Sequence, residues 1–264
     1  MRSLSRVGGL GAALLLGGAF AGGRVVDESF DRPTLSDFGK ALLAHRHISL
    51  AEGEGVAGGR AIRVEYRGNA RGSERVIVNY PLPGAVRYTL SFDVKFCPGF
   101  DFRKGGKLHG LGPARPVAGG NPVAAERWSA RAMFRRQGGL QSYLYSQDMF
   151  GRYGDAQVAR NFHFEADRYY AISFQVELNR PASASNGFVR IYVDGAEVLY
   201  RKNIRFRTRD SARSQIRTLM FNTFHGGHTP DWAPRNADGS YAVECAYFDN
   251  FSATPALVIK PFPG

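Results

Sequence analysis

The feature that most restricts the fold of this chain is a period-two alternation of apolar and polar residues, which recurs along most of its length. The alternating runs are rich in Val, Ile, Tyr and Phe, and Gly, Pro and Asn stand between them. Such runs predict short antiparallel β-strands, because successive side chains of a strand point to opposite faces. They cover residues 75–80, 86–96, 128–136, 141–147, 169–178, 188–201, 217–224 and 241–253.

Many short strands in one chain predict an all-β fold, and we expect one domain over residues 22–264 built as a two-sheet antiparallel jelly roll. With 264 residues, 44% of them hydrophobic, the chain can bury a core of that size. Asp194-Gly195, inside the run 188–201, predicts a tight hairpin. The concave sheet of such a fold commonly provides a groove for a polysaccharide.

Residues 1–21 have the pattern of a secretory signal peptide. Arg2 and Arg6 give a basic start, residues 10–16 a short apolar stretch, and residues 19–21, Ala-Phe-Ala, a small-x-small cleavage site. The apolar stretch is too short to span a bilayer, so we expect a secreted or periplasmic protein with no membrane association after cleavage. An uncleaved anchor is the alternative.

The chain is strongly basic, with 35 Lys and Arg against 23 Asp and Glu and a formal net charge of +12. A protein with this excess attracts polyanions. For an exported protein we expect an acidic polysaccharide or an anionic surface as partner rather than nucleic acid, because no nucleic-acid-binding motif is present. A merely solvated basic surface is the alternative.

Cys97 and Cys245 are the only cysteines. In an oxidising compartment they can form one disulfide, since Cys97 ends one strand-like run and Cys245 lies within another. Two buried free thiols are the alternative. Neither is a candidate nucleophile, because no base is identifiable beside it.

Two common kinds of site have little support. A glycoside hydrolase needs a pair of carboxylates on one face of its groove. The acidic residues of this chain instead stand singly along the sequence, as at Glu126, Asp148, Glu165 and Asp249. A metal centre has equally little support, because His225 and His228 lie on a glycine loop without an evident third metal ligand, and we expect them near a groove rim.

Residues 102–112 concentrate lysine, arginine and glycine, which suggests a flexible turn carrying Lys107. The run is not a phosphate-binding loop, because Leu108 follows the lysine where that motif has Ser or Thr. Downstream, alternation places Ser129 and Arg131 on one face of a strand and Trp128 on the core face. Tyr143 and Tyr145 share a face of the next strand, although ordinary packing of strand aromatics is an alternative for both.

Several of these motifs occur together in the order found in polysaccharide lyase family 14. They are Lys-Gly-Gly-Lys-Leu-x-Gly-Leu at 104–111, Trp-Ser-Ala-Arg from Trp128, Tyr-Leu-Tyr at 143–145, a variant histidine-glycine motif from Phe224 and Tyr-Phe-Asp-Asn-Phe at 247–251. From about residue 86 onward the chain therefore resembles this family and the related alginate and glucuronan lyases. The resemblance implies a β-jelly roll that cleaves polyuronates by β-elimination, with no cofactor and no obligatory metal.

The resemblance also implies the cleft residues, which fall on Lys107, Ser129, Arg131, Tyr143 and Tyr145. β-Elimination removes the proton at C5 beside a uronate carboxylate, so positive charge must stabilise the enolate-like intermediate. We expect Arg131 to hold the carboxylate, Lys107 and Tyr143 to act as base and acid in an order left open, and Ser129 and Tyr145 to position the sugar. Neighbouring cations should lower the pKa of Tyr143 and so favour its phenolate form.

One departure from the family pattern is His109, which replaces the usual proline after Lys-Leu and is expected to loosen the turn that carries Lys107. A non-catalytic, lectin-like module that binds acidic polysaccharide is the alternative to a lyase, and a basic surface-adhesion protein is a third reading. We expect a monomer in each case.

The shared cleft sets a condition on the hairpin between the two strands. Opposed residues on antiparallel strands face the same side, so the numbers of paired residues must sum to an even number if Arg131 and Tyr143 share a face. A three-residue loop, residues 137–139 with its last position left-handed, satisfies this condition with Arg131 opposite Tyr145 and Met133 opposite Tyr143, and a bulge that restores the phase is the alternative. A two-residue turn at 138–139 would place the tyrosines on the Trp128 face.

Overall fold

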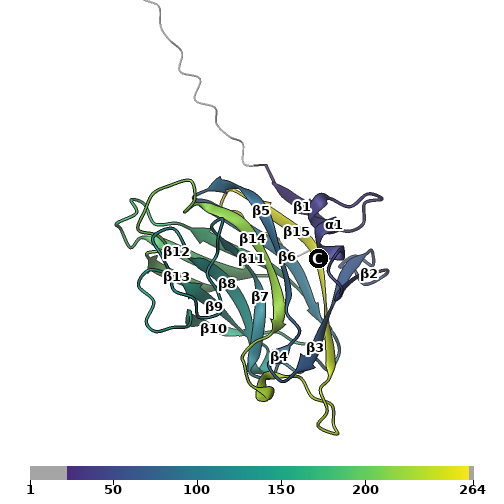
Figure 1. Cartoon of the computed structure of the whole chain (residues 1–264). Coiled ribbons are helices and arrows are strands. Elements are labelled where there is room, and N and C mark those ends of the chain that lie inside the picture. Colours follow the sequence, from purple (N-terminus) through teal and green to yellow (C-terminus); the bar gives the residue numbers. More distant parts are fainter. Residues whose placement is uncertain (1–22, 262–264) are drawn as a thin grey trace, which may run out of the picture.

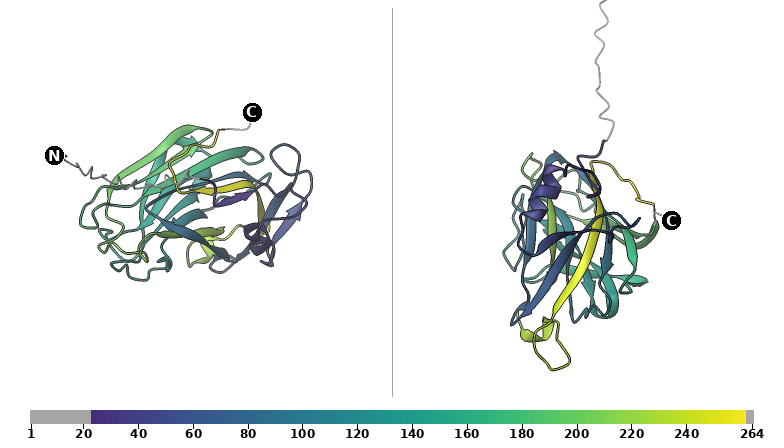
Figure 2. Two further views of the ribbon diagram at one scale, coloured as in Figure 1. Left: turned by 90° about the horizontal axis from the view of Figure 1, so that it is seen from above. Right: turned by 90° about the vertical axis from the view of Figure 1, so that its right-hand side faces the viewer.

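The computed structural model describes residues 23–261 as two antiparallel β-sheets that pack face to face (Figures 1 and 2). The predicted signal peptide, residues 1–21, lies outside the described residues. The predicted all-β jelly roll is confirmed. Outside the sheets lie one short helix, α1 (Asp37–Leu43), and two 3₁₀ turns, η1 (Arg136–Gly138) and η2 (Pro230–Trp232). Residues 23–261 contain no helix that is both long and apolar enough to cross a membrane.

The larger sheet has nine strands. Its main order is β13 (Ala196–Ile204), β12 (Gly187–Val193), β11 (Tyr169–Glu177), β6 (Arg87–Phe96), β15 (Val243–Thr254), β3 (Ala61–Asn69) and β2 (Ile48–Ala51), while β1 (Val26–Glu28) pairs with β15 and β4 (Gly72–Ser73) with β3. The smaller sheet has the order β10 (Asp155–His163), β9 (Gly139–Tyr145), β8 (Ser129–Arg135), β7 (Gly105–Gly112), β14 (Ile216–His225) and β5 (Val76–Ala85).

Aromatic side chains fill the space between the sheets because the alternating runs turn every second residue inward. Phe96 of the larger sheet contacts Phe134 of the smaller one with ring centroids 5.5 Å apart. Trp128 is fully buried, as predicted, and donates its indole N–H to the Ser214 carbonyl at 2.9 Å. Burial of each large apolar side chain contributes roughly 1.5–3 kcal/mol, so this layer is a main source of stability.

The run 188–201 forms a hairpin rather than one strand, with the predicted turn at its centre. Val193 pairs with Ala196 across Asp194-Gly195. Both turn residues have positive φ, 51° and 83°, as a two-residue hairpin of this type requires.

The basic glycine run was predicted to be a flexible turn, and this is wrong: residues 105–112 are strand β7, in the middle of the smaller sheet. Glycines hide the alternation that marks a strand, because they present no side chain to either face. A β-bulge disturbs it further. Between the pairs Lys107–Met133 and Gly110–Arg131, β7 has one residue more than β8.

The bulge turns both Leu108 and His109 into the core, where they are fully buried. His109 stacks on Phe221 with ring centroids 4.2 Å apart, so it does not loosen a turn as expected. Burial lowers the pKa of His109 to about 3, and the ring is neutral at ordinary pH. Neither ring nitrogen has a hydrogen-bond partner among the described residues.

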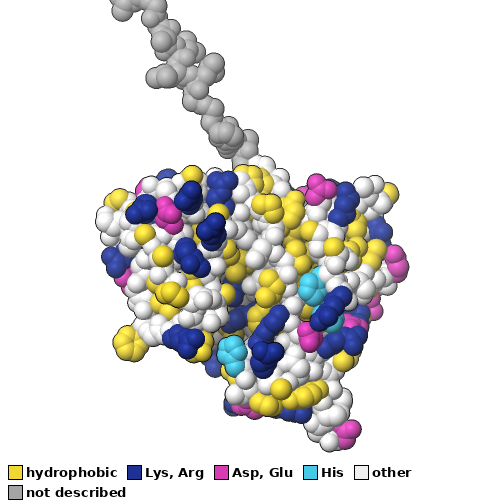
Figure 3. All heavy atoms as spheres, in the orientation of Figure 1, with side chains coloured by type: hydrophobic (Ala, Val, Ile, Leu, Met, Phe, Trp, Pro, Cys, Tyr) yellow, Lys and Arg dark blue, Asp and Glu magenta, His cyan; other side chains and the backbone are white. Residues whose placement is uncertain are grey.

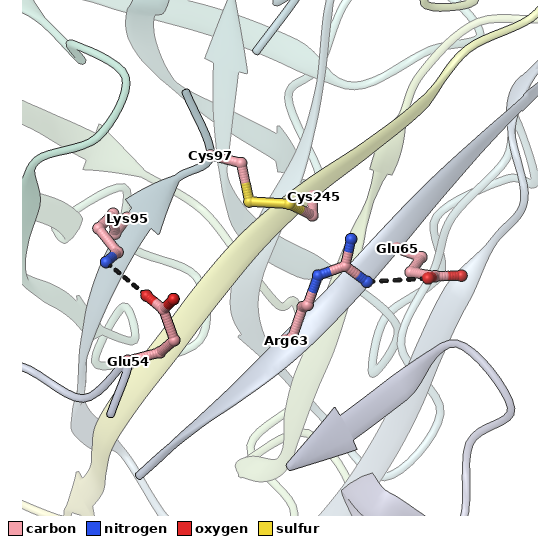
Figure 4. Close-up of a disulfide and its surroundings, with 6 residues drawn as sticks. All are labelled: Glu54, Arg63, Glu65, Lys95, Cys97 and Cys245. Atoms are coloured by element: carbon pink, nitrogen blue, oxygen red, sulfur yellow. Dashed lines mark hydrogen bonds and ion pairs between the residues drawn. A yellow bond between two sulfur atoms is a disulfide. The ribbon is translucent and has the colours of Figure 1, made fainter. Parts of the chain in front are cut away.

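The two cysteines form a disulfide, which confirms one of the two alternatives for them (Figure 4). Cys97 follows β6 and Cys245 lies in β15, the neighbouring strand, with Cα atoms 5.4 Å apart. The backbone N–H of Cys97 also donates to the Cys245 carbonyl at 3.0 Å. The bond therefore ties two central strands of the larger sheet at one end.

We expect the double variant Cys97→Ala/Cys245→Ala to lose about 2–4 kcal/mol of unfolding free energy, because the disulfide closes a long loop in the unfolded chain. The sequence separation is 148 residues. Urea unfolding followed by tryptophan fluorescence measures the change, and the reduced wild-type protein should match the variant. An unchanged unfolding midpoint in both samples would contradict this expectation.

Candidate active site

The five predicted cleft residues come from three adjacent strands of the smaller sheet. Lys107 lies on β7, Ser129 and Arg131 on β8, and Tyr143 and Tyr145 on β9. Arg131 pairs with Tyr143, Ser129 with Tyr145, and Lys107 with Met133, so all five side chains leave the sheet on the face opposite the core. Figure 3 shows this face, on which Lys and Arg side chains predominate over Asp and Glu.

The even-sum condition on the hairpin is confirmed, but the predicted loop is wrong. The last pair between the two strands is Phe134–Leu140, residues 136–138 connect β8 to β9, and Tyr143 lies opposite Arg131 instead of Met133. The connection contains η1, with positive φ at Gln137 and Gly138 instead of at Gly139. A Cβ at position 138 would lie 2.1 Å from the Phe164 carbonyl oxygen, so only glycine fits there.

Lys107 is half-buried and lies against Tyr143. Its Nζ is 3.6 Å from the centroid of the Tyr143 ring and donates a weak hydrogen bond to the Met133 sulfur at 3.0 Å. Desolvation by burial, followed by the charges of Arg131 and Arg75, lowers the pKa of Lys107 well below its ordinary value. The side chain is therefore far more readily neutral than an exposed lysine, as a proton acceptor must be.

Tyr143 is also half-buried, and its hydroxyl accepts a hydrogen bond from the Gly154 N–H at 3.1 Å. The expectation of a lowered pKa is wrong: burial, together with the neighbouring Tyr145, raises the pKa of Tyr143 above its ordinary value. Arg131 lowers it, but by less than desolvation raises it. Tyr143 therefore keeps its proton at neutral pH and can serve as a proton donor.

Arg131 is only 2% exposed, and it lies below the two tyrosines. Its guanidinium carbon is 5.7 Å from the centroid of the Tyr143 ring and 5.8 Å from that of Tyr145. Its buried Nε has no hydrogen-bond partner among residues 23–261. Burial lowers the pKa of Arg131, yet an arginine stays protonated because its ordinary pKa is so high. A buried cation without a carboxylate is costly unless an anion binds to it.

Ser129 and Tyr145 lie beneath the loop of residues 113–127. The Ser129 hydroxyl donates to the Val117 carbonyl at 2.6 Å, and the Tyr145 hydroxyl accepts from the Gly120 N–H at 2.9 Å. Both residues are almost fully buried, with Tyr145 1% exposed. Arg131 Nη2 is 3.5 Å from the Ser129 hydroxyl. Contact of Ser129 and Tyr145 with a sugar stays a prediction, while the contacts described support a role in holding Arg131.

Sequence reasoning missed Gly110 and Arg75. Gly110 is opposite Arg131, whose side chain crosses it: a Cβ at position 110 would lie 2.5 Å from Arg131 Cγ. Arg75, just before β5, stacks over Phe224 at 4.4 Å and adds positive charge near Lys107. Glycine at the alternate positions 110 and 112, shortly after Lys107, could have indicated that this part of the sheet surface forms the bottom of a site. No local signal indicates Arg75, because it is distant in sequence.

His225 and His228, the two histidines of the variant histidine-glycine motif, have different environments. His225 is buried among aromatic rings, contrary to the expectation of a rim position, and its Nε2 is 2.7 Å from the Asp101 carbonyl oxygen. Burial lowers its pKa to about 4. His228 lies on the loop after β14, with its ring 6.4 Å from that of Tyr153, so the loops 146–154 and 226–229 border the site together. Among residues 23–261, no group of three or more His, Cys, Asp or Glu side chains could hold a metal ion.

The chain belongs to polysaccharide lyase family 14, whose model matches residues 60–251, and it is therefore a polysaccharide lyase. The similar solved structures include a mutant of the alginate lyase Aly36B in complex with alginate trisaccharide, at 25% identity and a TM-score of 0.63, covering 73% of this chain and 80% of that one. None of the curated proteins matches the chain.

Two further structures support the fold alone. The alginate lyase of family 14 from Aplysia kurodai has 22% identity and a TM-score of 0.63, with 78% of this chain and 86% of that chain covered. The endo-β-1,4-glucuronan lyase from Trichoderma reesei has 14% identity and a TM-score of 0.53, with coverage of 80% and 90%.

Proposed function

We propose that this protein is an exported, monomeric lyase that cleaves an acidic polysaccharide of the alginate or glucuronan type by β-elimination. The observation that carries the proposal is the contact of Lys107 Nζ with the Tyr143 ring, 3.6 Å from its centroid, above a buried arginine. The net charge of +12 favours a polyanionic substrate. Export is proposed from the pattern of residues 1–21.

The lowered pKa of Lys107 and the raised pKa of Tyr143 support one assignment of base and acid. Neutral Lys107 takes the proton from C5, and the electron pair of that C–H bond passes into the carboxylate to give an enolate-like dianion. Arg131 balances this charge from below. The dianion then forms the C4–C5 double bond as the C4–O4 bond breaks, and Tyr143 donates its proton to the leaving oxygen.

We expect the purified protein to release unsaturated uronate ends from alginate or glucuronan, detected as a growing absorbance in the far ultraviolet. Hyaluronan serves as a third polyanion for comparison. Because the proposed steps use side chains of this chain alone, a chelator should leave the rate unchanged. Binding of these polymers without any new absorbance would refute the lyase and favour the binding module. Activity that chelation abolishes and a divalent ion restores would refute the metal-independent mechanism.

A further inference from the structure

A hollow of about 450 Å³ lies at the end of the smaller sheet where β7 begins. The segment before β7, the β8–β9 connection and η2 form its walls. Three cations, Arg103, Lys104 and Arg136, line it together with the carboxylates Asp101 and Asp231. None of these residues belongs to the proposed catalytic group.

The hollow lies at the end of β7, the strand that carries Lys107. Lys104 directly precedes β7, on which Gly105 is paired with Arg135, and Arg136 follows that residue. Lys107 is two strand positions from Gly105, a distance of about 7 Å along an extended strand. A polysaccharide bound at Lys107 and lying along β7 would therefore reach the cations of the hollow.

The charges in the hollow are not fully balanced. Lys104 pairs with Asp231, and Arg103 is 3.6 Å from Asp101. Arg136 is exposed and has no carboxylate at ion-pair distance within the described part of the chain, so one positive charge is in excess. The buried Nε of Arg103 also lacks a partner among these residues. The hollow can therefore accept one further carboxylate.

We propose that this hollow is a second carboxylate-binding site for the uronate chain, located away from the bond that is cleaved, and that Asp231 competes with the substrate for Lys104. The proposal rests on the proposed polyuronate substrate. Contact with Lys104 and with Thr229 lowers the pKa of the Asp231 carboxyl group to about 2, so Asp231 is ionised, as the carboxylates of the substrate are. Loss of this competitor should strengthen binding of the polymer.

The test compares variants with opposite expected effects on the KM for the polymer that the enzyme cleaves. Lys104→Ala/Arg136→Ala should raise KM about tenfold, the effect of losing a hydrogen bond to a charged group. Asp231→Asn should lower KM severalfold, and it keeps the oxygen that accepts from the Thr229 hydroxyl. Because the hollow does not touch the reacting atoms, kcat should change less than about twofold in each variant.

The matched control is Lys202→Ala/Arg213→Ala, which removes two exposed cations from another part of the surface. A double variant no weaker than this control, or an Asp231→Asn variant with unchanged or higher KM, would overturn the proposal. The same variants in a Lys107→Ala background are titrated with alginate and glucuronan by calorimetry. This arm judges the hollow by binding alone, so it remains decisive even if no polymer is cleaved and the proposed function fails.

Discussion

Lys107→Met and Tyr143→Phe are each expected to reduce kcat by roughly 10²–10⁴, the range for loss of a general base or acid. Methionine keeps an unbranched side chain, shorter by one heavy atom than that of lysine, but cannot accept the C5 proton. Phenylalanine keeps the ring that contacts Lys107 Nζ at 3.6 Å but has no hydroxyl to protonate the leaving oxygen. Steady-state assays on the cleaved polymer measure both effects, with Lys202→Met as the control for loss of one surface charge.

The pH dependence separates the two roles. Lys107 must be deprotonated, so kcat/KM should rise with pH through the lowered pKa of Lys107 and fall only above the raised pKa of Tyr143. The rising limb should disappear in Lys107→Met and the falling limb in Tyr143→Phe. Rates within threefold of the wild type in both variants, or a rising limb that persists in Lys107→Met, would contradict this assignment.

A change in folding can be distinguished from a change in catalysis. The pKa of Lys107 is lower in the folded state than in the unfolded state, so the protein loses stability as the pH falls below the pKa that this lysine has in the unfolded chain. The Lys107→Met variant should therefore unfold at the same temperature as the wild type or a higher one at neutral pH. A loss of activity accompanied by a lower unfolding temperature would point to structural damage instead.

Arg131→Lys is expected to lower kcat/KM by about 10²–10³, as found when a preorganised donor to a developing negative charge is removed. Lysine keeps the charge but offers no planar fork for a carboxylate. Lysine also keeps the Cγ atom that lies over Gly110, so the packing at that position is retained. The loss should appear largely in kcat, because the charge on the carboxylate grows as the C5 proton leaves.

Arg190→Lys provides the matched control, since Arg190 on β12 also lies beside an aromatic ring, 4.2 Å from the centroid of Tyr200. It should keep normal kinetics because it belongs to the larger sheet. An Arg131→Lys enzyme within threefold of the wild type would show that a point charge suffices, and the bidentate carboxylate contact would be wrong.

The strands that sequence predicted well are those whose side chains carry the alternation themselves. Trp128, directly before β8, and Arg131, on β8, point to opposite faces because they are three positions apart in an extended chain. Strand β7 was missed because glycines show no alternation and its bulge breaks the period. The hairpin length depended on the fit of Gly138 against Phe164, a contact between distant parts of the chain.

The electrostatics of the site were less predictable than its residues. Sequence places cations beside Tyr143, which by themselves would lower its pKa. The opposite shift arises mainly from burial and secondly from Tyr145, which together outweigh the lowering by Arg131 and by the hydrogen bond from Gly154. Likewise, nothing local could decide between a disulfide and two thiols, because that choice depends on Cys97 and Cys245 meeting on adjacent strands.

The disulfide also has a consequence for proteolysis. Strands β7, β8, β9 and β14 all lie between Cys97 and Cys245, so the residues of the proposed catalytic group belong to one covalently closed segment. The most exposed large apolar side chain of that segment, Phe150 at 95% exposure, is on the β9–β10 loop, where a protease has ready access. A single cut there would separate β9 from β10 in sequence but leave both pieces joined, and the nicked enzyme would remain one molecule until the disulfide is reduced.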